Sequence, residues 1–431
     1  MFNEKRIYQV LDIMRKTTKK DANKTMKQLL QNMRDGRTSV AEVPVPSVRP
    51  GTALVRTVNS LVSAGTERML VEFAGKSLIS KAKSRPDLIR QVIDKSRREG
   101  ILPTIQAAFN RLDQPLSLGY SSAGIIIKVG SDMEGFEPGM PVTCAGGGYA
   151  VHAEYAVVPK NLLVPLPPSV DFESAAFTTL GAIALHGFRL AAPQLGENIA
   201  VIGLGLLGLL TVGIARAAGC AVFGTDINPE RVSLAQSMGA VAAHTSEALS
   251  SGQSFTNGQG FDAILICADT PSNEPIELAG QLARDRAQVV VIGAVGLKVP
   301  RKVYYDKELQ LKVSRSYGPG RYDTNYEEKG LDYPIGYVRW TERRNMAEFV
   351  NLLASGQLNV QPLITHRFPI ERAAEAYELI TGKRKQPFLG ILLTYPETTK
   401  EAKRQIRLTT SHITPTHELR LGVLGAGNYA L

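Results

Sequence analysis

Three glycines in the middle of the chain, Gly203, Gly205 and Gly208, have the spacing of a phosphate-binding turn. An apolar run at 198–202 precedes them, and an apolar stretch follows, so the pattern predicts a strand, a glycine turn and a helix that starts near Leu206. Gly203 allows the tight turn, Gly205 lets a pyrophosphate approach the backbone, and Gly208 lets the helix lie close to the strand. Free N–H groups at the helix N-terminus then attract the anion. A glycine-rich helix start without a ligand is the alternative.

An acidic residue ends the next predicted strand, since Asp226 follows Gly203 by 23 residues. A carboxylate there accepts hydrogen bonds from both hydroxyls of an adenosine ribose and repels a 2′-phosphate, which favours NAD as the cofactor. NADP is the alternative, because Arg231 can lie over the adenine or reach a 2′-phosphate. Cys267 and Gly293 end later strands, and ligands bind at the carboxyl edge of an open α/β sheet, so both are expected near the cofactor.

Composition limits the class of protein. The 431 residues suffice for two or three domains. Three widely spaced cysteines exclude a disulfide framework and a four-cysteine zinc lobe, and they fit a reducing cytoplasm. The apolar run at 199–215 contains glycines, which favours a strand and a buried helix over a membrane span, and no signal peptide precedes it.

The net charge of +10 is concentrated near the N-terminus, in residues 1–35 and 76–99. These stretches contain no nucleic-acid motif, so solvated helix faces are the simplest interpretation and no nucleic-acid partner is expected. An electrostatic funnel for a phosphorylated or nucleotide-linked substrate is the alternative.

The patterns predict an α/β chain of several parts. Strands are expected at 198–202, 220–225, 262–267 and 288–293, with helices between them, which indicates a doubly wound parallel sheet. A second strand and glycine turn, with Gly425 and Gly427, lies at the C-terminal end and predicts the truncated start of a second dinucleotide-binding domain. A strand that completes the first sheet is the alternative. The predicted parts are a basic extension (1–25), a β-rich domain (26–164) with a helical insert (68–112), the parallel sheet (165–315), a return to the β-rich domain (316–395), a linker (396–418) and the truncated start (419–431).

The chain resembles the medium-chain dehydrogenase/reductase superfamily over roughly residues 26–395. The resemblance lies in Val43-Pro-Val-Pro, the stretch from Leu118 to Val129, the Ala153-Glu-Tyr strand and the nucleotide fold. Residues 118–124, 145–150 and 317–323 are most similar to bacterial two-domain oxidoreductases, in which this half is fused to one similar to glucose–fructose oxidoreductase and inositol dehydrogenase. The resemblance implies a GroES-like catalytic domain beside a Rossmann domain. It also implies sugar or nucleotide-sugar substrates in cell-surface polysaccharide metabolism.

The zinc-binding positions of that superfamily hold other residues here. The Cys-Gly-Thr-Asp type turn reads Ser63-Ala64-Gly65-Thr66-Glu67, the Gly-His-Glu motif reads Gly119-Tyr120-Ser121, and the further ligand falls in Thr178-Thr179-Leu180. Alanine, tyrosine and serine are poor zinc ligands at neutral pH, so no zinc is expected. Cys144, His152 and Glu154 lack ligand spacing and are interpreted as ordinary residues at strand ends.

Without zinc, a side chain must donate or accept the proton at the substrate. The resemblance places Tyr120 where a metal-binding histidine faces the nicotinamide, so Tyr120 is the leading catalytic candidate, and a buried structural tyrosine is the alternative. Glu67 is the second candidate, as a base, as a partner that orients Tyr120, or simply as the partner of an arginine. A sugar or phosphate pocket, or equally a subunit interface, is expected from Arg321, Tyr322, Tyr337 and Arg339.

The sequence therefore predicts a zinc-independent, NAD(P)-dependent oxidoreductase that acts on a sugar-like alcohol or ketone. It is expected to be a cytoplasmic homo-oligomer, away from membranes, without its C-terminal oxidoreductase domain. A quinone or enone reductase, in which Tyr120 protonates carbon, is one alternative. A zinc-dependent alcohol dehydrogenase and a non-catalytic nucleotide-binding partner module are the others.

Overall fold

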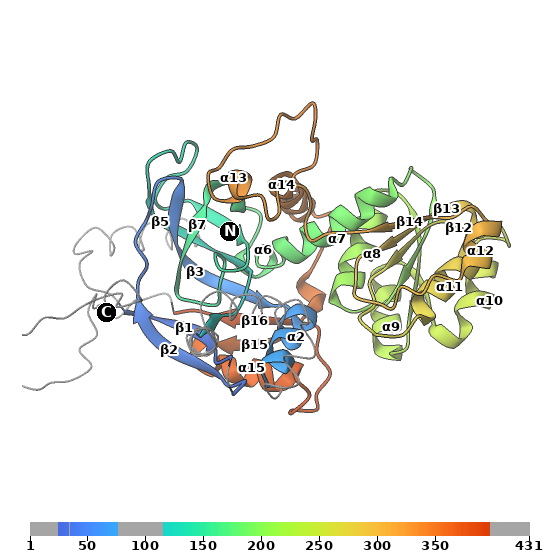
Figure 1. Ribbon diagram of the computed structural model, residues 1–431, viewed down its shortest axis with the longest axis horizontal. Coiled ribbons are helices and arrows are strands. Elements are labelled where there is room, and N and C mark those ends of the chain that lie inside the picture. Colours follow the sequence, from blue (N-terminus) through green and yellow to red (C-terminus); the bar gives the residue numbers. More distant parts are fainter. Residues whose placement is uncertain (1–24, 34, 76–114, 397–431) are drawn as a thin grey trace, which may run out of the picture.

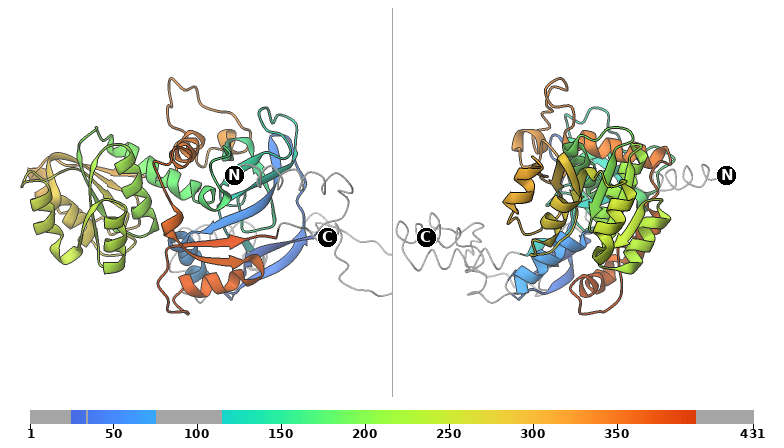
Figure 2. Two further views of the ribbon diagram at one scale, coloured as in Figure 1. Left: turned by 180° about the vertical axis from the view of Figure 1, so that it is seen from behind. Right: turned by 90° about the vertical axis from the view of Figure 1, so that its right-hand side faces the viewer.

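The computed structural model describes residues 25–33, 35–75 and 115–396. Figure 1 shows two lobes joined by the helix α7, and the reverse view in Figure 2 shows the same arrangement. The basic extension, most of the helical insert, the linker and the second glycine turn lie outside the described residues.

The first lobe is β-rich, as predicted for the GroES-like domain. A seven-stranded sheet has the order β15-β16-β3-β5-β6-β8, with β7 paired to β3, and a three-stranded sheet has the order β2-β1-β4. The strands are β1 Thr25–Gln31, β2 Thr38–Pro44, β3 Thr52–Val62, β4 Leu116–Ser117, β5 Ser121–Val129, β6 Pro141–Ala145, β7 Tyr155–Pro159, β8 Leu163–Pro165, β15 Ile364–Pro369 and β16 Gly390–Thr394. Its helices are α2 Ala64–Gly75, α6 Phe172–Ala175, α13 Thr324–Glu327, α14 Glu342–Ala354 and α15 Ala373–Ile380, with short 3-10 turns at Lys160–Leu162, Gln361–Leu363 and Ile370–Arg372.

The second lobe confirms the predicted doubly wound sheet. Its six strands are parallel, in the order β11-β10-β9-β12-β13-β14. They are β9 Asn198–Ile202, β10 Ala221–Asp226, β11 Val241–His244, β12 Phe261–Ile266, β13 Ala283–Val291 and β14 Gln310–Val313. The helices are α8 Leu206–Ala217, α9 Pro229–Ser237, α10 Ala248–Phe255, α11 Glu274–Leu282 and α12 Arg301–Asp306, with a 3-10 turn at Thr245–Glu247. β13 starts at Ala283, before the predicted start at residue 288. The prediction missed this part because the first half of the strand is polar and carries no apolar pattern.

The helix α7 (Thr178–Ala191) ties the lobes together. Most of its residues are buried, and its side chains share one apolar core with α8 and with β9. A Cβ atom at Gly181 would lie 2.1 Å from the Phe349 ring of α14, and one at Gly187 would lie 2.3 Å from Ile292, which follows β13. Both glycines are therefore needed for this close packing.

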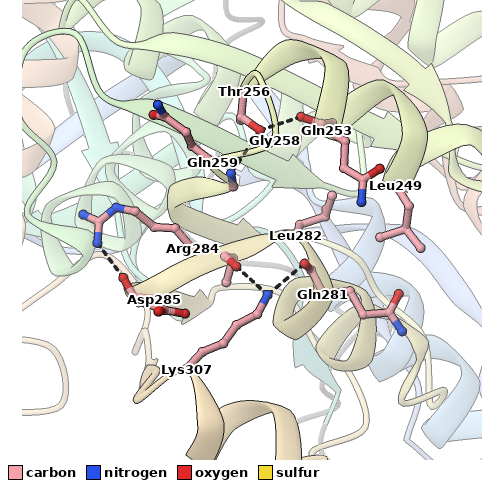
Figure 3. Close-up of a pocket in the computed structure, with 13 residues that line it drawn as sticks. Leu249, Gln253, Thr256, Gly258, Gln259, Gln281, Leu282, Arg284, Asp285 and Lys307 are labelled. Atoms are coloured by element: carbon pink, nitrogen blue, oxygen red, sulfur yellow. Dashed lines mark hydrogen bonds between the residues drawn. The ribbon is translucent and has the colours of Figure 1, made fainter.

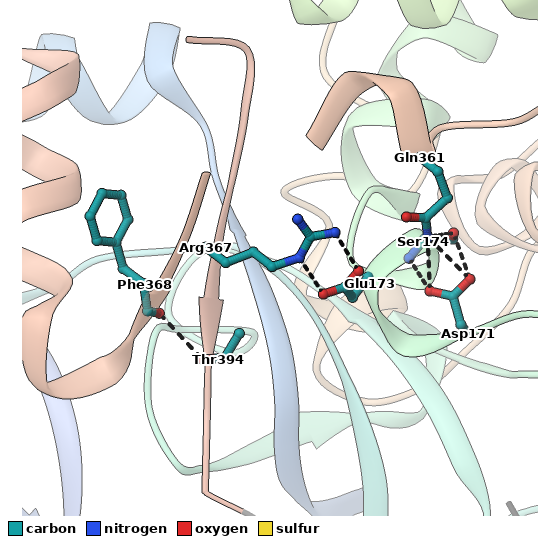
Figure 4. A network of polar contacts seen from close by, with 7 residues as sticks. All are labelled: Asp171, Glu173, Ser174, Gln361, Arg367, Phe368 and Thr394. Carbon is teal, nitrogen blue, oxygen red and sulfur yellow. Dashed lines mark hydrogen bonds and ion pairs between the residues drawn. The ribbon is translucent and has the colours of Figure 1, made fainter. Parts of the chain in front are cut away.

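A polar network fixes the segment before α7 (Figure 4). Asp171 caps α6 by accepting a hydrogen bond from the Ser174 amide at 2.8 Å, and Gln361 donates to the Ser174 hydroxyl at 3.1 Å. Arg367 of β15 holds Glu173 of α6 with two hydrogen bonds of 2.7 and 2.8 Å. The returning segment of the chain is thus attached to the first lobe just where α7 leaves it.

Among the described residues, no helix combines the length and the apolar composition that a membrane span requires. The apolar run at 199–215 is divided between β9 and α8, as its glycines predict.

Candidate active site between the two lobes

The glycine turn between β9 and α8 is closely packed at Gly203 and Gly208 but open at Gly205. Gly203 has a φ of +91°, and a Cβ atom on it would lie 2.7 Å from the Ala268 backbone. A Cβ at Gly208 would lie 1.9 Å from the Gly203 carbonyl oxygen. At Gly205, in contrast, the nearest atom would be the Arg231 guanidinium at 4.0 Å. Because no side chain caps the N-terminus of α8 at Gly205, its amides are available to an anionic group.

Asp226 lies buried at the end of β10 and holds this turn in place. Its carboxylate accepts hydrogen bonds from the Leu204 amide at 2.6 Å and from the Asn228 amide at 2.8 Å. Arg231 lies 3.8 Å from the same carboxylate. Since each carboxylate oxygen can accept more than one hydrogen bond, Asp226 keeps capacity for a hydroxyl ligand beside the turn.

Cys267 and Gly293 lie at the carboxyl edge of the sheet, as predicted, and the Cys267 side chain is directed into the interior. The Cys267 thiol is buried 3.5 Å from the Thr211 hydroxyl of α8, and burial raises its pKa to about 12. A Cβ at Gly293 would lie 2.1 Å from the Ala268 carbonyl oxygen, so this glycine allows the two strand ends to approach.

Tyr120 lies just before β5 and packs against the core that extends into the second lobe. Its hydroxyl donates a hydrogen bond of 2.6 Å to the Ser63 Oγ atom, directly before α2. In the first turn of α2, a Cβ on Gly65 would lie 3.7 Å from the carboxylate of Asp269, which follows β12. The start of α2, Tyr120 and the carboxyl edge therefore meet between the lobes.

The surroundings of Tyr120 favour its protonated form. Burial raises its pKa to about 12, against the lowering effect of hydrogen bonds with the Ser63 and Thr66 hydroxyls, and the charge of Glu67 raises it further. At neutral pH the phenol therefore carries its proton.

Glu67 is buried in a polar network rather than paired with an arginine. Its carboxylate accepts a hydrogen bond from the Ser63 amide at 2.9 Å and another from the Tyr377 hydroxyl. The His152 Nε2 atom lies 3.2 Å from the same carboxylate, and His152 Nδ1 lies 2.7 Å from the Ser60 Oγ. Glu67, in the first turn of α2, thus holds Ser63, the Tyr120 partner that lies directly before this helix.

His152, interpreted from the sequence as a strand-end residue rather than a metal ligand, lies in the segment just before β7, and it takes part in a network that the sequence did not reveal. The side chain is completely buried and belongs to the Glu67 network. Its flanking residues, Val151 and Ala153, are apolar, and a histidine within such a run was the signal available in the sequence.

The residues at the zinc positions do not fit a zinc site. Ala64 offers no donor atom, and the Tyr120 hydroxyl is bonded to Ser63. The Ser121 hydroxyl donates to the Ala176 carbonyl at 2.6 Å, and the Thr178 hydroxyl donates to a carbonyl of the preceding turn at 2.7 Å. Neutral hydroxyls that are already bonded to backbone are poor zinc ligands.

The second possible cluster does not converge either. Cys144 is buried in the apolar core of the first lobe, where burial raises its thiol pKa to about 12, and Glu154 accepts a hydrogen bond from the Lys27 amide at 2.8 Å. Within residues 25–33, 35–75 and 115–396, no three His, Cys, Asp or Glu side chains are arranged to hold a metal ion.

The predicted substrate residues do not form one pocket. Arg321 forms a 2.5 Å ion pair with Glu327 and stacks on the Tyr322 ring at 3.9 Å. Arg339 instead stacks on Trp340, 3.7 Å from the ring centre. The Tyr337 side chain is 90% exposed. Arg321 is thus held by an ion pair and Arg339 by a ring contact, and a role for this segment in a substrate pocket or in a subunit interface stays a prediction.

Glu342, a buried residue at the start of α14, lies beside this ion pair. Burial, assisted by the negative charge of Glu327, raises its pKa to about 9. The carboxyl group is therefore neutral in the folded protein at neutral pH.

A polar hollow at the opposite edge of the parallel sheet is not a second candidate (Figure 3). It lies where β12 and β13 begin, and its cation, Lys307, donates hydrogen bonds to the carbonyls of Gly280, Gln281 and Ala283 at 2.9, 3.0 and 2.6 Å. The ammonium group thus caps the C-terminus of α11.

The glycine turn yields a paired prediction. Gly205→Ala fits the free protein and should leave its thermal stability unchanged, but the new methyl group faces the open side and should weaken NADH binding about tenfold or more. Gly208→Ala should instead lower the free energy of unfolding by about 1–3 kcal/mol, because its methyl group overlaps a backbone carbonyl. NADH fluorescence titration and urea denaturation measure the two effects. Equal NADH affinity in Gly205→Ala and the parent would place the cofactor elsewhere.

Glu342 predicts a pH-dependent stability. Its pKa is about 9 in the folded protein and about 4.5 in the unfolded chain, so the unfolded chain alone loses the proton as pH rises between these values, and stability falls. Glu342→Gln removes this loss and should stabilise the protein more at pH 8 than at pH 5. Urea denaturation at both pH values, with the exposed Glu378→Gln as control, tests it. A benefit that is the same at both pH values would contradict the prediction.

Comparison with known proteins agrees with this architecture. Residues 94–168 match the alcohol dehydrogenase GroES-like domain, and residues 207–329 match the zinc-binding dehydrogenase family. Mouse sorbitol dehydrogenase is 26% identical over 298 residues, which cover 62% of this chain and 76% of that protein.

Solved structures share the fold. Galactitol-1-phosphate dehydrogenase from Escherichia coli has a TM-score of 0.65 at 23% identity, covering 86% of this chain and 100% of that one. A short chain alcohol dehydrogenase from E. coli CFT073, solved in complex with NADH, has a TM-score of 0.63 at 20% identity over 86% of this chain and 100% of that one. With the glycine turn and the two-lobed fold, these matches indicate an alcohol dehydrogenase-like oxidoreductase that is similar to the medium-chain, zinc-type alcohol dehydrogenases.

Proposed function

We propose that the chain is a zinc-independent, NAD-dependent oxidoreductase that interconverts a sugar-like alcohol and its ketone, with Tyr120 as the proton donor. The observation that carries this proposal is the protonated Tyr120 hydroxyl, bonded to Ser63 beside the carboxyl edge of the parallel sheet. The names of the relatives, sorbitol dehydrogenase and galactitol-1-phosphate dehydrogenase, support a polyol or sugar substrate.

The nicotinamide cofactor supplies or accepts the hydride when it is bound. In the direction of reduction, Tyr120 donates its proton to the carbonyl oxygen as that oxygen gains negative charge. Hydrogen bonds from the Ser63 and Thr66 hydroxyls then stabilise the phenolate. In the direction of oxidation, Tyr120 first releases its proton to solvent, and the resulting phenolate then accepts the alcohol proton. The charge of Glu67 opposes the ionised form and keeps Tyr120 loaded with its proton between turnovers.

The choice of NAD rests on Asp226. Its carboxylate lies beside the open Gly205 and would repel a 2′-phosphate, while its remaining lone pairs suit ribose hydroxyls. Arg231 lies 3.8 Å from that carboxylate. If NADP bound, the Arg231 side chain would have to turn away from Asp226 and toward the 2′-phosphate.

Tyr120→Phe tests the proposal directly. Loss of the hydroxyl should lower turnover by about 10²–10⁴-fold, because general acid catalysis contributes on that scale. NADH affinity should stay within about twofold of the parent, since the hydroxyl faces Ser63 rather than the glycine turn. Hydride transfer is followed by NADH absorbance with panels of polyols, ketoses, nucleotide sugars and quinones.

The outcomes separate the alternatives. Unchanged turnover in Tyr120→Phe would remove this residue from the mechanism. Activity with quinones alone would favour the enone or quinone reductase. Tight NADH binding without turnover on any panel would favour a nucleotide-binding partner module.

Zinc independence predicts a metal content well below one zinc per chain after purification in zinc-supplemented medium. Neutral hydroxyls and alanine at the ligand positions leave no set of donors that would retain the ion. Elemental analysis by mass spectrometry measures it, before and after dialysis against a chelator. Stoichiometric zinc that is lost in Cys144→Ser would overturn this part of the proposal, and Cys220→Ser is the matched control.

A further inference from the structure

We propose that His152 is a positioning residue for Tyr120, which it holds both through the preceding turn and through the Glu67 carboxylate. This inference rests on the proposed function, in which Tyr120 is the proton donor. It concerns a residue outside the glycine turn and outside the positions where the superfamily binds metal.

The first contact is with the turn that carries Tyr120. Gly119 has a φ of +94°, and a Cβ atom there would lie 2.7 Å from the Cγ atom of the His152 ring. The His152 amide donates to the Leu118 carbonyl at 2.8 Å, and the Leu29 amide donates to the His152 carbonyl at 2.9 Å. The ring is therefore packed on the backbone directly before Tyr120, and it occupies the space that a side chain at 119 would need.

The second contact is with Glu67, which holds Ser63, the partner of the Tyr120 hydroxyl. His152 Nε2 lies 3.2 Å from the Glu67 Oε2 atom, and Glu67 Oε1 accepts from the Ser63 amide at 2.9 Å. Ser63 in turn accepts from the Tyr120 hydroxyl at 2.6 Å. The contacts close a ring that runs from Tyr120 through Ser63, Glu67 and His152 to Gly119 and back to Tyr120. The His152 imidazole thus supports both the backbone before Tyr120 and, through Glu67 and Ser63, the Tyr120 hydroxyl.

The imidazole itself is fixed on its other side. His152 Nδ1 lies 2.7 Å from the Ser60 hydroxyl, which lies 2.7 Å from the Tyr395 hydroxyl. In the assignment that satisfies every atom, Tyr395 donates to Ser60, Ser60 donates to Nδ1, and the remaining proton on Nε2 is donated to Glu67. The Tyr377 ring lies edge-on to the imidazole with 6.4 Å between ring centres. Rotation of the His152 ring would break these bonds together.

The network explains why a histidine is needed rather than an apolar side chain of similar size. A buried carboxylate requires hydrogen-bond donors, and each donor that is lost leaves charge unsatisfied in the interior. Glu67 would keep the Ser63 amide and the Tyr377 hydroxyl without His152, but it would lose its link to the Tyr120 turn. A glutamine at position 152 can still accept from Ser60 and donate to Glu67, whereas a leucine can do neither.

The test uses the full chain with 3-fluorotyrosine at position 120, so that fluorine NMR reports on this side chain independently of turnover. In the parent and in His152→Gln we expect one matching resonance. In His152→Leu we expect a shifted or broadened resonance, and kcat lower by about tenfold or more with the NADH dissociation constant within about twofold. His186→Leu is the matched control, since His186 is a half-buried histidine in α7, and it should match the parent in both measurements.

An unchanged resonance and unchanged kcat in a folded His152→Leu would overturn the inference. If His152→Leu does not fold, His152→Asn decides, because its shorter amide cannot reach both Ser60 and Glu67. An Asn variant with the same resonance as the Gln variant overturns the inference. A shifted resonance in the Asn variant, beside a parent-like resonance in the Gln variant, supports it. If the resonances behave as expected but the parent transfers no hydride to any substrate, the proposed function fails and the positioning role stands.

Discussion

One buried carboxyl group, that of Glu67, connects distant parts of the first lobe of this protein. Glu67 is 1% exposed, and its carboxylate is satisfied only because three segments that are far apart in the sequence reach it. They are Ser63, which directly follows β3, the segment before β7 at His152, and α15 at Tyr377. An unsatisfied carboxylate at this depth would cost several kcal/mol, so the three segments are held to one geometry. The start of α2 and the hydroxyl of Tyr120 take their positions from it.

The two lobes contribute different groups to the region around Tyr120. The first lobe contributes polar side chains, while the second contributes backbone at the ends of its parallel strands. The helix α7 joins them through glycines that allow near-contact with α14 and with Ile292. Because these two positions leave no room for a side chain, the lobes are joined through a closely packed apolar core rather than through a polar linker.

The sequence was sufficient for the second lobe and for its cofactor turn, because both depend on short-range patterns. Apolar runs mark β9, β10 and β12, and the glycine spacing marks the turn that follows. β13 is the exception, because its polar first half carries no apolar pattern that would mark the start of the strand. The Glu67 network could not be found in this way, since His152 and Tyr377 are 85 and 310 residues away from Glu67. Composition likewise did not reveal that Arg321 forms an ion pair with Glu327, six residues on.

Asp226 couples the choice of nucleotide to the shape of the turn. Its carboxylate is the acceptor for the Leu204 amide within the glycine turn and for the Asn228 amide at the start of α9. A basic or apolar residue at this position would leave a buried amide of the turn without its acceptor, whereas an asparagine or a serine keeps an acceptor oxygen. If Asp226 selects the nucleotide as proposed, a change of preference at this position is therefore restricted to side chains that both lack the negative charge and still accept from the Leu204 amide.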